Sequence, residues 1–429
     1  MKLLIGGSPC THWSIAQTKN RETEASGIGW ELFLNYRIAR DKYQPDYFLY
    51  ENNKSMSPAI RAQITAELGV EPVLINSALV SAQNRQRLYW AGKRNPDGTY
   101  SQVPVEQPED RGILLRDILE TATGEKGYAI KPLTEKEMEY MVRETKDGRN
   151  HFDFDYFHDA TKDKSACVTA NTHKGVPYNV LAEPVPVNVT TDGKSRCLRA
   201  SYYKDGIRNM VGNTVDLKTC VAVPVRIGTI ENDAKNPEHD SQQYRVYSPD
   251  GKSVTLCGNG GGLGAKTGLY AAPVGGPGGR VCPVYEVRDG FITIKGKQYP
   301  IKLRDGCYII RKLTVRECMR LQTVPETYVF PVSDTQAYKM LGNGWTVDVI
   351  AHIMSHFEGL TEEPVEVLSM YDGMSCGHIA LDKLGVAIAA YYATEIDKYA
   401  VQTTQANFPD VVQLGDAFQV REPDWECLL

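Results

Sequence analysis

Apolar positions near the start of the chain follow two alternating patterns. Short apolar runs at 2–5, 47–50 and 73–80 have the length of buried strands. At 29–40 and 59–68, apolar residues instead recur with the spacing of one face of a helix. Because strands that alternate with helices form βαβ units, these patterns predict a largely parallel sheet.

The same alternation returns near the other end of the chain. Helical spacing is present at 314–321 and 336–356. Three apolar runs at 365–370, 387–393 and 411–414 then predict strands with helices between them. Both ends of the chain are therefore expected to belong to the α/β class.

The middle of the chain lacks helical spacing and is rich in Gly, Asn, Asp and short β-branched runs. One phrase recurs there in three variants, at 164–168, 194–198 and 252–256. We interpret the copies as related β-hairpins, and their unequal spacing excludes a regular solenoid. We therefore expect a smaller, mostly β domain at 151–310, between two parts of an α/β domain at 1–150 and 311–429.

The composition is typical of a soluble globular chain. Of the 429 residues, 42% are hydrophobic and 24% are charged, and no apolar run is long enough to span a bilayer. The ten cysteines are irregularly spaced, and no pair is separated by just two residues, so no zinc site or redox pair is indicated. We expect a cytoplasmic protein with reduced thiols, no membrane segment and no metal ion.

Charge is unevenly distributed along the chain, whose net charge is −5. Residues 161–310 hold 20 Lys and Arg against 13 Asp and Glu, whereas residues 358–429 hold 3 against 13. A basic middle suits contact with nucleic-acid phosphates. Ordinary surface variation explains the same counts, so charge alone leaves both interpretations open.

Cys10 is a candidate nucleophile. It follows a Gly-Gly-Ser-Pro turn at the carboxyl end of the strand predicted at 2–5, which is the edge where α/β sheets place ligands and catalytic groups. A cysteine held in such a turn is rigidly presented and partly exposed, as a reactive thiolate must be. The alternative is a small buried apolar residue, which is the commoner role of a lone cysteine.

An acid and two arginines are predicted at the same edge. Glu51 directly follows the strand at 47–50, and Arg85 and Arg87 stand where the next strand begins. These side chains are therefore expected to converge on Cys10. Each has an ordinary alternative, which is a helix cap for Glu51 and a solvated strand end for the arginines.

A second group of residues suits a nucleotide-like cofactor. The strand at 365–370 leads into a glycine-containing loop at 371–377 and then a helix, an arrangement that lets the backbone approach an adenosyl or dinucleotide group. Glu395 and Asp416 end the next two strands. Acids at such positions can accept hydrogen bonds from ribose hydroxyls or from an adenine amino group.

Together these residues resemble the motifs of the DNA cytosine-5 methyltransferase family. The turn that ends in Cys10 is similar to its Pro-Cys nucleophile motif, and Glu51-Asn52-Asn53 is similar to its Glu-Asn-Val motif with Asn53 in place of Val. Gln83-x-Arg85-x-Arg87 matches its Gln-x-Arg-x-Arg motif. The phrase at 311–322 matches its Arg-x-Leu-Thr-x-x-Glu-x-x-Arg-Leu-Gln phrase.

The two remaining motifs belong to the cofactor side of the family. Gly342-Asn343-Gly344-Trp345 is similar to its last motif, and Tyr371-Asp372-Gly373-x-x-x-Gly377 is similar to its first. The Asp-Gly form of the first motif is nearest to the de novo methyltransferase branch. In the family the cofactor motifs come first and the Pro-Cys motif follows, so the order in this chain is circularly permuted.

The resemblance implies a fold, a chemistry and a substrate. The fold is a Rossmann-like S-adenosylmethionine-dependent methyltransferase sheet with a target-recognition domain at 151–310. Cys10 would attack carbon 6 of a cytosine that has left the DNA stack, Glu51 would bond or protonate ring nitrogen 3, and Arg85 and Arg87 would hold the base. The expected partner is double-stranded DNA, on which the protein would act as a monomer.

The resemblance also implies a set of residues around S-adenosylmethionine. They are Tyr371, Asp372, Gly373, Met374, Gly377, Glu395, Ile396, Asp416, Asn343 and Trp345.

Three other functions remain as alternatives. A DNA-binding module without activity is disfavoured by Cys10, Glu51 and Arg85, and an RNA cytosine methyltransferase is disfavoured by the large middle region. A thiol hydrolase would need a histidine partner, and only His12 is close in sequence. Within the first interpretation, host modification, phage self-protection and orphan roles are equally compatible with the sequence.

Overall fold

The chain folds into two compact units. One, here called the sheet unit, comprises Met1–Ile130, Asp155–Val180 and Leu313–Leu429, and the other, the insert unit, comprises Lys131–Phe154 and Leu181–Lys312. The computed structural model describes residues 1–9, 12–13, 21–120, 132–154, 156–160, 162, 164–184, 226–229, 245–247, 269–270 and 284–425.

The sheet unit is built on one eight-stranded sheet. Its strand order is β17-β16-β15-β1-β2-β4-β3, with β5 paired to β4. The strands are β1 (Lys2–Gly6), β2 (Tyr47–Asn53), β3 (Val73–Asn76), β4 (Gln86–Arg94), β5 (Tyr100–Gln102), β15 (Val365–Met370), β16 (Ile388–Thr394) and β17 (Val412–Gly415). From β17 to β2 all neighbours are parallel, whereas β4 is antiparallel to its partners. The predicted Rossmann-like α/β sheet is therefore confirmed.

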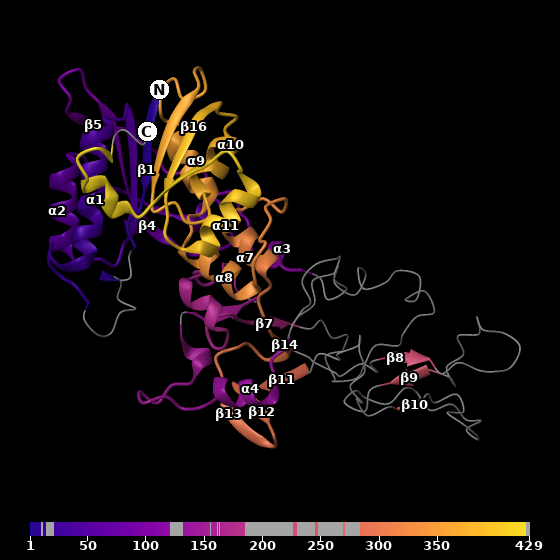
Figure 1. Cartoon of the computed structure of the whole chain (residues 1–429). Helices are drawn as coiled ribbons and strands as arrows, with labels where there is room; N and C mark the ends of the chain where they lie inside the picture. The colour runs from indigo at the N-terminus through magenta and orange to yellow at the C-terminus, as the bar shows by residue number, and fades with distance from the viewer. Residues whose placement is uncertain are drawn as a thin grey trace, which may run out of the picture. The chain divides into compact units, whose positions relative to one another are not determined.

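The two ends of the chain supply adjacent strands at the centre of this sheet. β1 pairs with β15 on one side, from Lys2 opposite Glu366 to Gly6 opposite Met370, and with β2 on the other. Figure 1 shows this as an indigo strand beside an orange one. The carboxyl ends of β1, β2 and β15 consequently meet at one edge.

Helices cover both faces of the sheet. α1 (Gly27–Tyr43) and α2 (Pro58–Leu68) lie on one face, and α9 (Val347–Met354), α10 (Cys376–Lys383) and α11 (Lys398–Asn407) lie on the other (Figure 1). Successive residues of β1 serve the two faces, as the pleat of a strand requires. Leu4 belongs to the core under α1 and α2, whereas Ile5 lies directly against Gly377 of α10.

The described part of the chain has four further α-helices. They are α3 (Leu115–Ile118), α4 (Glu135–Met141), α7 (Val315–Leu321) and α8 (Asp334–Asn343).

Two predicted elements are shorter than their apolar patterns. The helix expected at 336–356 is two helices, α8 and α9, because the chain becomes extended at Gly344 (ψ 171°). The strand expected at 73–80 ends at Asn76, whose side-chain oxygen accepts hydrogen bonds from the backbone N–H groups of Ala78 and Arg85. In both places a polar or glycine residue interrupts the apolar run.

The described part of the insert unit is mostly β structure. Its strands β11 (Val284–Arg288), β12 (Phe291–Ile294), β13 (Lys297–Pro300) and β14 (Gly306–Lys312) pair antiparallel in the order β13-β12-β11-β14. The other described strands between residues 150 and 283 are β6 (His158–Asp159), β7 (Val180–Pro184), β8 (Arg226–Thr229), β9 (Arg245–Tyr247) and β10 (Leu269–Tyr270).

The boundaries of the two units differ from the domain boundaries that the sequence predicts at residues 150 and 310. Residues 155–180 belong to the sheet unit because Ser165 accepts a hydrogen bond from the backbone of Asn84 and donates one to Ala82. The first copy of the repeated phrase, at 164–168, is therefore not a hairpin of the middle domain, and that interpretation was wrong. The copies at 194–198 and 252–256 lie outside the described residues.

Candidate functional site

The loop after β1 passes directly beside Glu51 at the end of β2. A Cβ atom on Gly7 would stand 2.8 Å from the Glu51 carbonyl oxygen and 3.0 Å from its Oε2, so only glycine fits there without displacing the acid. The described part of this loop ends at Pro9, and Cys10 lies outside the described residues. The structure thus brings the segment before Cys10 to the acid, and the convergence of Cys10 itself on Glu51 stays a prediction.

The buried side chain of Asn52 holds the same loop in place. The Asn52 side chain donates to the Ser8 carbonyl oxygen at 3.1 Å and to the Tyr50 hydroxyl at 3.1 Å. The Ser8 and Tyr50 hydroxyls share a hydrogen bond of 2.7 Å. Burial raises the pKa of Tyr50 above its usual value, so the phenol stays neutral and serves as a hydrogen-bonding group.

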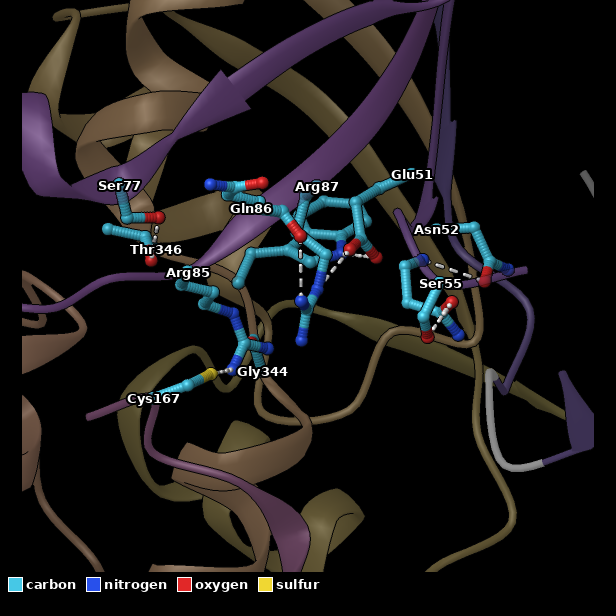
Figure 2. Close-up of polar contacts among 12 residues, drawn as sticks. Glu51, Asn52, Ser55, Ser77, Arg85, Gln86, Arg87, Cys167, Gly344 and Thr346 are labelled. Carbon is cyan, nitrogen blue, oxygen red and sulfur yellow. Dashed lines mark hydrogen bonds and ion pairs between the residues drawn. The ribbon is translucent and has the colours of Figure 1, made fainter. Parts of the chain in front are cut away.

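Two donors from different segments meet the Glu51 carboxylate. Arg87 Nε lies 3.0 Å from Oε1, and the indole Nε1 of Trp345 donates to Oε2 at 3.0 Å. Figure 2 shows the guanidinium of Arg87 turned toward Glu51. A half-buried carboxylate held in this way has a fixed plane and a fixed charge partner.

The Arg85 side chain points away from Glu51, toward Cys167 and Gly344 (Figure 2). It is 4% exposed, and its guanidinium donates at 2.7 Å to the carbonyl oxygens of both Val168 and Gly344, with longer bonds to Gly342. It also lies 3.5 Å from the Cys167 sulfur. The structure therefore separates the two arginines that the sequence placed together, leaving only Arg87 beside Glu51.

Two buried amides extend the contacts of Arg85. Gln83 donates to the Leu321 carbonyl oxygen and, at 2.8 Å, to the Gln322 side chain. Gln322 in turn donates to the Leu341 carbonyl oxygen at 2.6 Å and accepts from Thr346 Oγ1 at 2.9 Å. Both glutamines belong to motifs of the sequence, but no local pattern indicates that they bond to each other.

The loop at 371–377 after β15, here called the cofactor loop for the role that the sequence predicts, has an uncommon backbone conformation. Tyr371, Gly373 and Ser375 all have positive φ values, of 61°, 60° and 57°. The loop is held by Asp372, which accepts hydrogen bonds from Ser369 at 2.6 Å, from Tyr391 at 2.8 Å and from Ser375. Asp372, which is half-buried, therefore holds the loop in shape through side-chain hydrogen bonds.

The surroundings of Asp372 also change the pKa of its carboxyl group. Loss of solvation raises the pKa of its carboxyl group to about 6, while the three hydroxyl donors oppose the rise and the charge of Glu395 adds to it.

Other predicted loop residues are also turned inward. The Tyr371 hydroxyl donates to the Leu32 carbonyl oxygen of α1 at 2.7 Å, and Met374 is 1% exposed. The Met374 carbonyl oxygen accepts a 2.7 Å hydrogen bond from Tyr328, a residue that sequence reasoning missed. Nothing in the sequence around Tyr328 signals this contact, because it depends on the fold alone.

The outward surface of the loop belongs to Gly373 and the next strand end. A Cβ on Gly373 would meet no atom of the described residues within 4 Å, so this part of the chain leaves the loop open on that side. Glu395 accepts from the backbone N–H groups of Gly373, Ile396 and Asp397 at 2.7–2.8 Å, and the side chain of Ile396 is 75% exposed. Asp416 ends β17 and accepts from the Phe418 N–H at 3.0 Å. An acid and an exposed apolar side chain thus flank an open glycine.

The segment between α8 and α9 completes the site. Asn343 is exposed, and Trp345 is half-buried. The backbone N–H of Trp345 bonds to the Cys376 thiol at the start of α10, and burial raises the pKa of that thiol to about 12. The thiol is therefore neutral, and it connects this segment to the cofactor loop.

Two further observations concern only the described residues. Among them, no group of His, Cys, Asp and Glu side chains is arranged to hold a metal ion. No helix in the same part of the chain is long and apolar enough to cross a membrane.

The chain is similar to known proteins over most of its length. The sequence model of the C-5 cytosine-specific DNA methylase family matches residues 1–250 and 273–358. The orphan methyltransferase M.Rho11sI of Bacillus phage rho11s is 26% identical over 294 residues, which is 59% of this chain and 53% of that protein. The type II methyltransferase M.HhaI of Haemophilus parahaemolyticus is 27% identical over 173 residues, 40% of each chain.

The matches span about half or less of these relatives' own lengths. Among solved structures, the Entamoeba histolytica methyltransferase EhMeth aligns with 83% of this chain and 76% of its own, with a TM-score of 0.37 and 12% identity.

The different surroundings of the two arginines predict different effects on stability. Arg85→Lys replaces a planar guanidinium, which reaches several carbonyl oxygens, with a single ammonium group. This change should lower the free energy of unfolding by roughly 2–3 kcal/mol. Arg87→Lys should lower it by less than about 1 kcal/mol. Urea unfolding of both variants measures the difference. An Arg85→Lys variant as stable as the parent chain would contradict the structural role.

The raised pKa of Asp372 predicts a pH-dependent contribution to stability. The folded state binds this proton more tightly than the unfolded state, so the contribution is largest below about pH 4 and is lost as the pH rises through about 6. Relative to Asp372→Asn, the parent chain should therefore lose roughly 1–3 kcal/mol of stability across this range. Denaturant unfolding from pH 4 to 7 measures it.

Asp97→Asn is a suitable control for this measurement. Asp97 is exposed, and hydrogen bonds from Thr99 lower its pKa, so its difference from the parent chain should stay flat between pH 5 and 7. A flat difference for Asp372→Asn as well would contradict the prediction.

Proposed function

The chain belongs to the C-5 cytosine-specific DNA methylase family, and on this premise we propose that it transfers a methyl group to carbon 5 of cytosine in double-stranded DNA. The observation that carries the proposal is the meeting of Glu51, Arg87 and the loop before Cys10 at one sheet edge. The cofactor loop opens at the carboxyl end of β15, two strands away from Glu51 in the same sheet.

Methyltransferases of this family use S-adenosylmethionine, whose sulfonium supplies an electrophilic methyl group. The residues around the cofactor loop fit this molecule. Gly373 leaves room for close approach, Glu395 offers a fixed carboxylate to ribose hydroxyls, and exposed Ile396 offers an apolar surface to adenine. Asp416, Asn343 and Trp345 would complete the site, while Asp372, Tyr371, Met374 and Gly377 would maintain its shape.

The protein's own groups divide the chemistry between them. The Cys10 thiolate would add to carbon 6 of cytosine, and the electron density that accumulates on the ring would be stabilised by a hydrogen bond or proton that Glu51 donates to ring nitrogen 3. Carbon 5 would then take the methyl group, which leaves S-adenosylhomocysteine, and loss of the carbon 5 proton to solvent would restore the 5,6 double bond and expel Cys10 as a thiolate. Arg87 keeps Glu51 in place and is the arginine available to the base, whereas Arg85 would act through the backbone that it holds.

The target cytosine has to leave the DNA stack before these groups can reach it. The insert unit stands in the chain where the family keeps its target-recognition domain. Its strands and the excess of Lys and Arg at 161–310 support a role in contacting phosphates and base edges.

The order of the motifs is proposed to be a circular permutation of the family's order. If β15 is counted as the first strand and the count continues through β17 to β1, the sheet begins with the order 3-2-1-4-5 of doubly wound folds. The Met1 amino group lies 3.4 Å from the Pro364 carbonyl oxygen, and Trp425 packs in the same core as Leu4. This proximity of the two ends supports the permutation.

The proposed chemistry predicts that Cys10→Ser abolishes methyl transfer while cofactor affinity stays within about threefold, because the cofactor residues are elsewhere. A DNA duplex with fluorine at carbon 5 of the target cytosine should trap a covalent adduct on Cys10, since no proton can leave carbon 5. Mass spectrometry of the adduct and transfer of a labelled methyl group measure both effects. Cys167→Ser is the matched control, and turnover by Cys10→Ser would exclude the mechanism.

The permutation predicts that a rearranged chain is active. Joining Leu429 to Met1 through a short linker and opening the chain at 358–364 should keep transfer within about tenfold, because polar connections tolerate a break. The control opens the chain inside α1, between the buried Phe33 and Tyr36, and should not fold. A folded permutant that binds no cofactor would contradict the proposed order.

A further inference from the structure

Trp345 connects two parts of the site that lie far apart in the sequence. Its indole N–H donates to Glu51 Oε2 at 3.0 Å, across 294 positions of the chain. Its backbone N–H bonds to the thiol of Cys376, the first residue of α10 after the cofactor loop. The sequence predicted only that Trp345 lines the cofactor site.

The contact with Glu51 restricts the carboxylate from several sides. Arg87 occupies Oε1, Trp345 occupies Oε2, and the backbone at Gly7 lies so close that a Cβ there would be 3.0 Å from Oε2 and 3.5 Å from the indole nitrogen. With two donors from separate segments, the carboxylate is held against rotation. Removing the indole donor would leave Arg87 as the one described side chain that holds the Glu51 carboxylate.

We propose that Trp345 is a positioning residue for Glu51. This inference rests on the proposed function, in which Glu51 meets ring nitrogen 3 of the target cytosine. The indole N–H holds the carboxylate in the orientation that reaches the base, and the backbone of Trp345 ties that orientation to the cofactor loop through Cys376. Methyl donor and acid are thereby aligned by one residue.

The alternative is that only the aromatic ring matters, as a wall of the cofactor site. The two roles use different parts of the side chain, so Trp345→Phe separates them by keeping a ring and removing the N–H. Trp345 is half-buried and lies outside the main core, which makes this exchange compatible with folding.

The kinetic test uses the full-length chain with saturating DNA and S-adenosylmethionine. Trp345→Phe should lower the single-turnover rate of methyl transfer by roughly 10- to 100-fold, while the dissociation constant for the cofactor changes by less than about threefold. Trp90→Phe is the matched control, because it removes an indole bond of 3.0 Å to Thr65 inside the core. It should leave both quantities unchanged.

A double-mutant cycle shows whether Trp345 acts through Glu51. In a Glu51→Gln background, adding Trp345→Phe should lower the rate by less than about twofold, because the group that it positions is already gone. An unchanged single-mutant rate, or a cofactor affinity weakened tenfold or more with a normal saturating rate, would overturn the proposal.

A spectroscopic readout separates this inference from the proposed function. In a chain labelled with ¹⁵N-tryptophan, the indole resonance of Trp345, assigned by its loss in Trp345→Phe, should shift in Glu51→Gln without DNA or cofactor. An unshifted resonance would overturn the contact. A shifted resonance in a chain whose parent transfers no methyl group would support the contact and overturn the proposed function instead.

Discussion

Backbone carbonyl groups that accept hydrogen bonds from buried side chains are the constraint around which this site is arranged. They lie in the segment around Val168, at the last residue of α7 and at the carboxyl end of α8, and belong to Val168, Leu321, Leu341, Gly342 and Gly344. A buried oxygen left without a donor costs about 1–3 kcal/mol, so the fold requires side chains that reach several of them at once. Arg85, Gln83 and Gln322 meet this need with a planar fork and two amides. The motifs that contain these residues are therefore parts of one hydrogen-bonded set, although the chain separates them widely.

This set determines where the chemically active groups can lie. The carbonyl oxygen of Gly344 is held by Arg85, and the next residue, Trp345, reaches Glu51 on β2 and Cys376 on α10. A guanidinium that is 4% exposed and faces carbonyl dipoles tolerates little displacement, because any shift leaves a buried charge partly unpaired. The geometry at Glu51 thus depends on a residue that does not touch it.

Local sequence patterns predicted the strands well because both faces of β1, β2 and β15 are buried, which produces continuous apolar runs. They did not predict which side the arginines face. Positions two apart on a strand share a face, but β4 begins only at Gln86, and the backbone of Arg85 is bonded to Asn76, so alternation does not extend to it. The inward turn of Asp372 was equally hidden, since it depends on Tyr391 of a neighbouring strand. The motifs predict where the site lies, whereas the side-chain packing of the folded chain separates the two arginines and brings Ser369, Ser375 and Tyr391 to Asp372.

The central position of β1 also has a consequence for how the molecule is made. Its amino end contacts Pro364, 363 positions later in the chain, and β15 follows directly. During synthesis one edge of β1 has no partner until the ribosome has produced more than three quarters of the polypeptide. Contacts with such sequence separation form slowly, and an unpaired strand edge is prone to pair with other chains. The arrangement that places Glu51 and the loop after β15 in one sheet of the finished protein therefore leaves the nascent chain exposed to aggregation for most of its translation.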